Sequence, residues 1–449
     1  MHRGRPSSYL EGSVGLRVTA AAGQHDLLFL PWDVPLEEWP ESTLVALPRG
    51  ISRHIVRFVR LGNDVYAVKE TVEPIAQHEY DLLFELGRRG IPCVDPVGIV
   101  AGRTDQAGED LPAAIITRHL QFSLPYRALF STTLRPDTAN RLLDALAVLM
   151  VRLHLVGFAW GDCSLSNTLF RRDAGAFAAY LVDAETGEIH EPLSQGRREY
   201  DLQTAELNVG GELLDVEASG RLHPSIDPIE TSQQVRKRYE RLWDEITAPQ
   251  SMTFGDRHAL EARVRRLNEL GFDVAELSVV GEEGGSSVRV TPKVVDVGHH
   301  TRRLIRLTGL DVEENQARRM LNDLDTFRVS QGIPSQDEEV AAHRWVAEVF
   351  EPITGMVPGE LRGKLEPAQM FHEVLEHRWF MGERLGRDVT LEEAAQDYVG
   401  TVLAQKPDEK AVLGLRLGTP SNTDGLRFDE TAELDLSELA DYDVDDEKD

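Results

Sequence analysis

The sequence has 449 residues, of which 41% are hydrophobic, so it is long enough for about two or three domains with packed cores. It carries 48 Lys and Arg against 76 Asp and Glu, which gives a formal net charge of −28. This balance argues against a general nucleic-acid binder and against attraction to anionic membranes, because both need a basic surface. The two cysteines, Cys93 and Cys163, do not suggest a disulfide framework and fit a reducing compartment.

We expect neither a signal peptide at the start of this sequence nor a membrane-spanning stretch within it. The first residues, MHRGRPSSYLEGS, include basic residues but lack the apolar run of a signal peptide. No stretch approaches the roughly 20 apolar residues that span a bilayer. We therefore expect a cytoplasmic protein with no membrane span. Residues 406–449 end in a strongly acidic stretch, which predicts a solvated, disordered tail or, alternatively, an interaction tail.

The amino-terminal part has the pattern of a β-rich region. Short apolar runs separated by Pro, Gly and Asn predict strands. These runs are Val14–Thr19, Asp26–Leu30, Thr43–Leu47, His54–Arg60, Val65–Lys69, Val97–Val100 and Ala113–Thr117. Pro74 then opens a predicted helix with Leu82, Leu83 and Leu86 on one face.

A long helix and a polar loop follow. Apolar residues at helical spacing predict a helix from Thr138 to about Leu155, and His154 at its end is expected to be a structural, hydrogen-bonded histidine. The loop after it carries Asp162 and Asn167, and two short apolar runs lead to Asp183. This order of Asp, Asn and Asp is typical of a phosphoryl-transfer site.

The chemistry explains this choice of residues. The first carboxylate, Asp162, would orient and deprotonate an acceptor hydroxyl. Asn167 and Asp183 would hold Mg²⁺, a hard cation that prefers oxygen ligands. Glu185 lies two residues after Asp183 on an extended segment and is either a second metal ligand or an ordinary charged loop residue.

Helices dominate the rest of the chain. Glu199–Leu214 and Thr231–Thr247 are predicted helices, the first with Asp201 near its start. A helix at Asp256–Leu270 and a hairpin of Val274–Val280 with Ser287–Val295 come next. The remaining helices are expected at His300–Thr308, Val312–Val329, Gln336–Phe350, Pro367–Leu385 and Leu391–Leu403. His372 and His377 are five residues apart, so they do not form the zinc motif, which needs histidines four apart.

The residues around the polar loop carry a family resemblance. Leu153-His154, Gly157, Gly161-Asp162, Asn167 and Leu181-Val182-Asp183 resemble the catalytic and metal loops of the protein-kinase-like superfamily. Within it, the chain is most similar to the lipopolysaccharide (Kdo) kinase-like branch. The whole chain resembles a bacterial family that joins such a region to a domain of unknown function, number 4032.

The resemblance implies an α+β, protein-kinase-like two-lobed fold followed by a mostly helical domain. We expect the amino-terminal lobe at 1–120, the carboxy-terminal lobe at 121–250, the helical domain at 251–405 and the acidic, disordered tail at 406–449. The cofactors implied are ATP and Mg²⁺.

The resemblance also assigns residues to the nucleotide. Lys69, at the end of the Val65–Lys69 strand, is similar to the lysine that contacts the α- and β-phosphates. Glu79 resembles the glutamate that pairs with it, and Glu85 is the competing candidate. The loop over the phosphates is poor in glycine. Either it uses Gly50, Ser52 and Arg53 to cover them, or it is an ordinary hairpin turn.

The chain departs from the protein-kinase pattern at two positions. Trp160-Gly161-Asp162 stands where His-Arg-Asp is usual, so we expect Trp160 to have a packing role and no arginine-dependent activation switch. Ala184-Glu185 follows the metal Asp where Phe-Gly is usual, which leaves the active state of this loop open.

These features predict a Mg²⁺- and ATP-dependent phosphotransferase with a hydroxyl-bearing acceptor such as a sugar or a lipid, or a protein partner. The alternative is a pseudokinase that senses a nucleotide or acts as a scaffold through its helical domain. The weak glycine loop and the Asp-Ala-Glu sequence favour the alternative, whereas the intact Lys69, Asp162, Asn167 and Asp183 favour the enzyme.

Overall fold

The structure is a computed structural model that describes residues 15–20, 25–45, 54–62, 64–130, 136–248, 250–253, 272–281, 287–406 and 409. Three expectations lie outside these residues: the helix at Asp256–Leu270, the loop with Gly50, Ser52 and Arg53, and the acidic tail apart from residues 406 and 409. Lys406 and Glu409, which were expected in the disordered tail, are buried, so the folded part of the chain extends past the expected boundary at 405. The chain divides into two compact units. The first consists of Met1–Phe84 and Val94–His119, and the second of Glu85–Cys93 and Leu120–Asp449.

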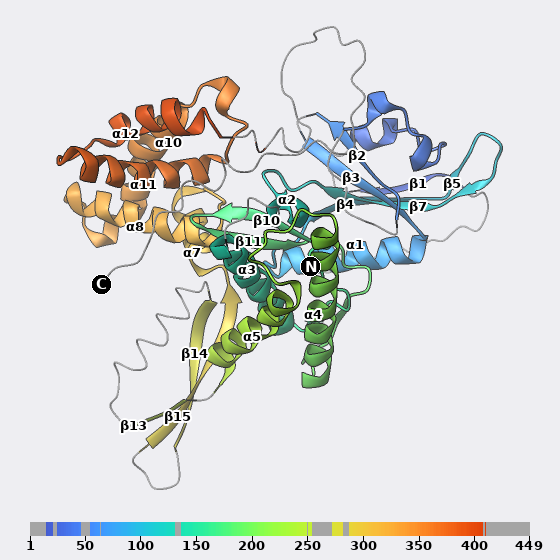
Figure 1. Cartoon of the computed structure of the whole chain (residues 1–449), viewed down its shortest axis with the longest axis horizontal. Helices are drawn as coiled ribbons and strands as arrows, with labels where there is room; N and C mark the ends of the chain where they lie inside the picture. Colours follow the sequence, from blue (N-terminus) through green and yellow to red (C-terminus); the bar gives the residue numbers. More distant parts are fainter. Residues whose placement is uncertain are drawn as a thin grey trace, which may run out of the picture. The chain divides into compact units, whose positions relative to one another are not determined.

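The first unit contains an antiparallel five-stranded sheet with the strand order β1-β4-β7-β3-β2 (Figure 1). Its strands are β1 (Arg17–Ala20), β2 (Val56–Leu61), β3 (Asp64–Thr71), β4 (Asp95–Ala101) and β7 (Ala113–Arg118). Strand β3 runs into helix α1 (Glu73–Arg88), and a small hairpin, β5 (Arg103–Thr104) with β6 (Asp110–Leu111), follows β4. Alternate residues of β3 point to opposite faces of the sheet, so Val68 and Lys69 are separated.

One face of this sheet is covered by the segment around residues 25–44, whose secondary structure differs from the prediction. The expected strand at Asp26–Leu30 is instead a 3-10 helix, His25–Phe29, because Leu27 is fully buried and its carbonyl accepts a hydrogen bond from the Trp32 indole at 2.7 Å. The expected strand at Thr43–Leu47 is reduced among the described residues to a bridge between Leu44 and Val59. The core on this face contains Leu27, Trp32, Leu36, Trp39, Val59, Tyr66, Val68, Val97, Val100, Ala114 and Ile116.

A buried ion pair fixes the same segment to the sheet. Arg103 Nη1 lies 2.7 Å from Glu70 Oε1, and both side chains are excluded from solvent. The remaining donors of Arg103 bind the carbonyl groups of Trp32, Val34 and Pro112. Because each of the three guanidinium nitrogens has an acceptor, the usual cost of burying a charge is offset.

The kinase-like part of the second unit is built on three helices and a hairpin. The helices are α3 (Pro136–Leu155), α4 (Gln195–Ala218) and α5 (Pro228–Thr247), and the hairpin is formed by β10 (Thr168–Asp173) and β11 (Ala176–Leu181). Smaller elements are β8 (Leu124–Pro125), α2 (Tyr126–Leu129), β9 (Phe158–Ala159) and β12 (Glu188–Ile189). Helix α4 continues through Gly210. A Cβ there would lie 3.2 Å from Ser232 Oγ of α5, so the missing side chain allows the two helices to pack closely.

The remainder of the second unit is mostly helical, as predicted. A three-stranded sheet of β13 (Gln250–Thr253), β15 (Ser287–Val297) and β14 (Phe272–Gly281) comes first. The helices are α7 (His299–Thr308), α8 (Glu314–Ser330), α9 (Glu338–Trp345), α10 (Glu351–Gly355), α11 (Pro367–Leu385) and α12 (Leu391–Tyr398). Residues Val346–Phe350 and Val399–Leu403 are π-helical. Trp345, Phe371 and Tyr398 lie at the centre of their shared core.

We refer to residues 299–409 as the helical domain. Two histidines of helix α11 in this domain lie beside acidic residues. His372 lies beside Glu376, and His377 Nε2 lies 2.7 Å from Asp397 Oδ2, so neither histidine forms a pair facing one ligand. Within the described residues, no helix is both long and apolar enough to cross a membrane.

Candidate active site

Lys69 and Glu79 form a buried ion pair in the first unit. The Lys69 Nζ lies 2.8 Å from Glu79 Oε2, and the two side chains are 11% and 2% exposed. Lys69 reaches α1 because strand alternation directs it away from the core face that Val68 occupies. Glu85, the competing candidate, pairs instead with Arg88 on its own helix and with Arg89 in the turn after it. The geometry therefore selects Glu79 as the partner of Lys69.

The turn after α3 is shaped by two glycines. Gly157 and Gly161 have φ values of +84° and +78°, which favour glycine. A Cβ on Gly157 would lie only 2.1 Å from the His190 carbonyl oxygen, and one on Gly161 would lie 3.0 Å from the Thr186 carbonyl oxygen. Both glycines of the sequence motif are thus required by close backbone approach.

Asp201, on α4, binds the backbone of this turn. Its carboxylate accepts hydrogen bonds from the backbone N–H groups of Trp160 at 2.6 Å and Gly161 at 2.8 Å. His154 bridges Asp201 and the Tyr239 hydroxyl at 3.2 and 2.7 Å. Burial lowers the pKa of His154, which keeps the ring neutral, and burial also raises the pKa of Tyr239. His154 is therefore a structural residue.

Asp162 is held by two asparagine side chains. Asn167 Nδ2 donates to Asp162 Oδ2 at 3.3 Å and to its carbonyl oxygen at 3.0 Å. Asn208 Nδ2, on α4, donates to Asp162 Oδ1 at 3.0 Å and to the Cys163 carbonyl at 3.1 Å. Amide donors to both carboxylate oxygens fix the orientation of the side chain without neutralising its charge.

Glu212, on the same helix, holds the rest of the loop. Its two carboxylate oxygens accept hydrogen bonds from the backbone N–H groups of Leu165 at 2.7 Å and Ser166 at 2.9 Å. Burial raises the pKa of Glu212, although these hydrogen bonds act in the opposite direction. Ser164 Oγ accepts from Asn167 N at 3.1 Å, so the backbone on both sides of Ser166 is constrained.

Asp183 accepts hydrogen bonds at both its backbone carbonyl and its side chain. The buried Trp160 donates its indole N–H to the Asp183 carbonyl at 2.9 Å, which gives the tryptophan a specific role beyond packing. Asp183 Oδ1 accepts a hydrogen bond from Glu185 N at 3.0 Å. Ala184 is fully buried, and its carbonyl accepts from Gly187 N at 2.9 Å, which closes a tight turn after the Asp.

The oxygen groups around this loop suit a hard cation. The amide nitrogen of Asn167 is used in binding Asp162, which leaves the amide oxygen as its group for a metal. Asn167, Asp183 and Glu185 are all partly exposed, whereas their backbone neighbours Thr168 and Ala184 are buried. Amide and carboxylate oxygens are the ligands that Mg²⁺ takes from proteins, so these residues fit Mg²⁺.

The structure thus brings Lys69 to Glu79, Asp162 to Asn167, and Asp183 to Glu185. The sequence patterns did not single out Asn208 or Glu212, and they placed Asp201 only near the start of a predicted helix. A signal for them existed, because Asp201, Asn208 and Glu212 are seven and four residues apart and therefore share one face of a helix. What the sequence lacked was the direction in which that face points.

Two protein families match separate parts of the chain. The lipopolysaccharide kinase (Kdo/WaaP) family matches residues 53–208, and a domain of unknown function, DUF4032, matches residues 241–403. A solved structure described as "WaaP in complex with acyl carrier protein" is 15% identical, covers 57% of this chain and 99% of that chain, and has a TM-score of 0.34. No curated protein shows significant similarity. Along the chain, a region that matches the Kdo/WaaP lipopolysaccharide kinase family is thus followed by a region that matches DUF4032.

Proposed function

We propose that this protein transfers the γ-phosphoryl group of Mg²⁺-bound ATP to a hydroxyl group of an acceptor. The observation that carries the proposal is the orientation of Asp162, which accepts hydrogen bonds from Asn208 at 3.0 Å and from Asn167 at 3.3 Å. A carboxylate fixed in this way is suited to accept a proton from an alcohol, and Asn167 links it to the metal-binding side of the loop. The family match favours a sugar or lipid hydroxyl as the acceptor class.

The reaction follows from these groups. The acceptor oxygen forms a bond to the γ-phosphorus as the bond to the β–γ bridging oxygen breaks, and the acceptor proton passes to Asp162. Lys69, held by Glu79 at 2.8 Å, binds the α- and β-phosphate oxygens. When bound, Mg²⁺ would neutralise the charge that develops on the phosphates, and Asn167 and Asp183 would hold it. Glu185 is a further candidate ligand.

A nucleotide sensor without transferase activity is the second candidate. Ala184 is fully buried in the turn that Gly187 closes, where the kinase pattern has Phe-Gly. A turn of this kind is suited to a fixed rather than a switching metal loop. Such a protein would bind Mg²⁺-ATP with the same residues but would not turn it over.

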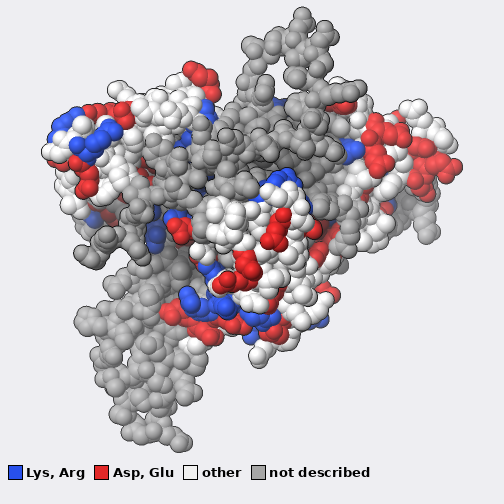
Figure 2. Space-filling view, in the orientation of Figure 1, with Lys and Arg blue, Asp and Glu red and all other residues white. Residues whose placement is uncertain are grey.

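The charge distribution bears on the partners. Figure 2 shows acidic and basic side chains interspersed over the described residues of the face it views, rather than one broad basic area. Together with the net charge of −28, this supports a nucleotide and a small acceptor or protein partner in the cytoplasm, rather than nucleic acid.

Calorimetric titration of ATP into the protein, with Mg²⁺ and with EDTA, tests the proposal. We expect Mg²⁺-dependent binding that Lys69→Met and Asp183→Asn weaken at least about tenfold. Lys237→Met, an exposed lysine on α5, and Asp215→Asn, an exposed aspartate on α4, are the matched controls and should bind as the wild type does. No binding at millimolar ATP would overturn both candidates.

Turnover then separates the two candidates. Release of phosphate from ATP, or transfer to sugar and lipid alcohols, is measured for the wild type and for Asp162→Asn. Turnover that Asp162→Asn abolishes while ATP still binds supports the transferase. Binding without turnover across these acceptors favours the sensor.

A further inference from the structure

The β10–β11 hairpin connects the candidate metal ligands to the helical domain. Asn167 immediately precedes β10, and Asp183 follows the end of β11 by two residues. The strands pair in register from Thr168 opposite Leu181 to Asp173 opposite Ala176. At the base, Val182 N donates to the Asn167 carbonyl at 3.0 Å. Both candidate ligands therefore leave the same end of one hairpin, and the hairpin's tip lies roughly 17 Å away along the strands.

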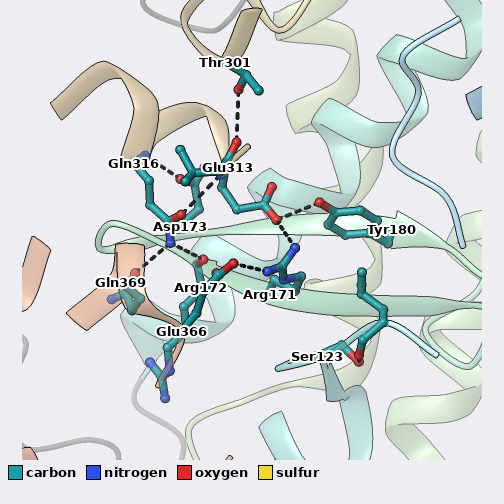
Figure 3. A network of polar contacts seen from close by, with 12 residues as sticks. Ser123, Arg171, Arg172, Asp173, Tyr180, Thr301, Glu313, Gln316, Glu366 and Gln369 are labelled. Carbon is teal, nitrogen blue, oxygen red and sulfur yellow. Dashed lines mark hydrogen bonds and ion pairs between the residues drawn. The ribbon is translucent and has the colours of Figure 1, made fainter. Parts of the chain in front are cut away.

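The tip of the hairpin caps a helix of the helical domain. Asp173 Oδ1 accepts a hydrogen bond from Gln316 N at 2.8 Å, and Asp173 Oδ2 accepts from Asn315 N at 3.1 Å and from Asn315 Nδ2 at 2.9 Å (Figure 3). These two N–H groups belong to the first turn of α8, whose donors have no partner within the helix. A carboxylate at this end also interacts favourably with the helix dipole. Asp173 is 3% exposed, so water does not compete for these bonds.

Arg171, two residues before Asp173, adds ion pairs to this contact. Arg171 Nη1 lies 3.1 Å from Glu313 Oε1, and Arg171 also binds Glu366. Tyr180, across the hairpin on β11, donates its hydroxyl to Glu313 at 2.6 Å. Figure 3 shows Arg171 and Tyr180 both directed from the hairpin to Glu313. Both strands of the hairpin are thus attached to the residue that precedes α8.

Backbone groups of the hairpin are bound as well. Gln316 Nε2 donates to the Arg172 carbonyl at 3.0 Å, and Gln369 Oε1 accepts from Ala174 N at 3.0 Å. The side chain of Arg172 pairs with Glu409 at 2.6 Å. Consequently Arg171, Arg172 and Asp173, three consecutive residues, contact three separate parts of the helical domain.

The hairpin has little strand pairing along its β10 edge, although Arg141 of α3 donates a hydrogen bond of 2.7 Å to the Gly175 carbonyl at its tip. On its far edge, β10 pairs with β8 only at Leu169 and Phe170, so Arg171–Asp173 has no strand neighbour there among the described residues. A two-stranded hairpin alone is marginally stable in water. The helical domain supplies the contacts that a third strand would otherwise make along this half of β10.

We propose that the helical domain positions Asn167 and Asp183 by holding the tip of the β10–β11 hairpin, and so sets how strongly the site binds Mg²⁺ and nucleotide. Asp173, Arg171 and Gln316 are then positioning residues, which act through the hairpin and touch no substrate. This gives the DUF4032 region a role in the phosphotransfer site, and for its effect on ligand binding it rests on the function proposed above.

Hydrogen exchange measured by mass spectrometry on the full chain tests the mechanical part without any ligand. The variants are Gln316→Ala in the helical domain and the milder Asp173→Asn in the hairpin. We expect amide exchange in peptides covering 164–170 and 180–187 to become at least about fivefold faster. The matched control is Asp323→Ala. Asp323 lies on the same helix, α8, but binds no hairpin residue in the described contacts; its carboxylate accepts a hydrogen bond of 2.7 Å from the Trp345 indole, which the substitution removes. It should leave these peptides unchanged.

A second arm measures the Mg²⁺ concentration at half-maximal ATP binding. The positioning variants should raise it by about tenfold, as loss of an outer partner does at metal sites, whereas ATP binding in EDTA stays the same. The proposal is overturned if exchange at 164–170 and 180–187 is unchanged in folded variants, or rises equally in Asp323→Ala. If the wild type binds no Mg²⁺-ATP, the proposed function fails, and the exchange result alone decides whether the helical domain holds the loop.

Discussion

The carboxylate of Asp173, at the end of strand β10, accepts a hydrogen bond of 2.8 Å from the backbone N–H of Gln316 in the first turn of helix α8. A strand residue of the kinase-like region therefore caps a helix of the helical domain, 143 residues further along the chain. The two regions are stabilised together at this point, because the buried carboxylate and the N–H groups of the first helical turn satisfy one another's hydrogen bonds.

Replacing Asp173 with Ala should lower the free energy of unfolding by about 1–3 kcal/mol, since it removes the acceptor of the hydrogen bonds from Asn315 and from the Gln316 backbone at a buried helix end. Urea denaturation monitored by circular dichroism measures this change. Asp144→Ala is the control, because Asp144 pairs with Arg238 at 2.7 Å but its side chain is 62% exposed. That loss should cost under about 1 kcal/mol. Equal effects of the two substitutions would contradict the capping role.

Glu313 should make the protein less stable as the pH rises. Burial raises its pKa from 4.5 to about 7, with Arg171 opposing and Asp173 adding to the shift. The folded protein then holds a proton that the unfolded chain releases between about pH 4.5 and 7, so stability is greatest at the lower pH and falls through this window. Burial raises the pKa values of Asp173 and Glu366 as well, which acts in the same direction.

The measurement for Glu313 is the melting temperature between pH 5 and 8 in wild type and in Glu313→Gln. The substitution keeps an acceptor for Tyr180 but removes the titrating proton, so the decline with pH should become shallower. Glu348→Gln, at an exposed pair with Arg344, should keep the wild-type slope. A slope in Glu313→Gln as steep as in wild type would refute the assignment.

Asn208→Leu should lower the rate of phosphoryl transfer without changing ATP affinity. Asn208 orients Asp162 at 3.0 Å and is not among the nucleotide-binding groups. Misplacement of a catalytic group by a fraction of a bond length to 1 Å costs up to about a hundredfold in rate. Steady-state turnover and calorimetric affinity together give this split, and Asn140→Leu on the exposed face of α3 is the control. A weakened ATP affinity with normal turnover would argue against this role for Asn208.

Glu79→Gln should weaken Mg²⁺-ATP binding by about tenfold, because the buried Lys69 loses the charge that holds it at 2.8 Å. The measurement is calorimetric titration. Glu73→Gln tests whether any acidic residue of α1 matters, since Glu73 pairs with Arg17 in an exposed position. Unchanged affinity in Glu79→Gln would show that the pair serves stability rather than phosphate binding.

Much of the architecture follows from local patterns. The helices α3, α5 and α11 lie close to the predicted ranges because their apolar residues repeat at helical spacing and their ends carry Pro, Asp or Gly. The 3-10 helix at His25–Phe29 was mistaken for a strand because a short apolar run has the same pattern in either state, and only its packing against the sheet selects one.

The sequence alone indicated the candidate site residues, with Lys69 before Asp162, Asn167 and Asp183, because their residue types and spacing are those that phosphoryl transfer requires. Tertiary structure decided which glutamate pairs with Lys69, and it brought Asn208 to Asp162 and Asp173 to Gln316. Contacts of this kind join residues far apart in the chain, and their side chains reveal no partner until the helix faces and the hairpin are placed. The physical reason is that hydrogen bonding and ion pairing are decided by distance in space, on which local sequence periodicity carries no information.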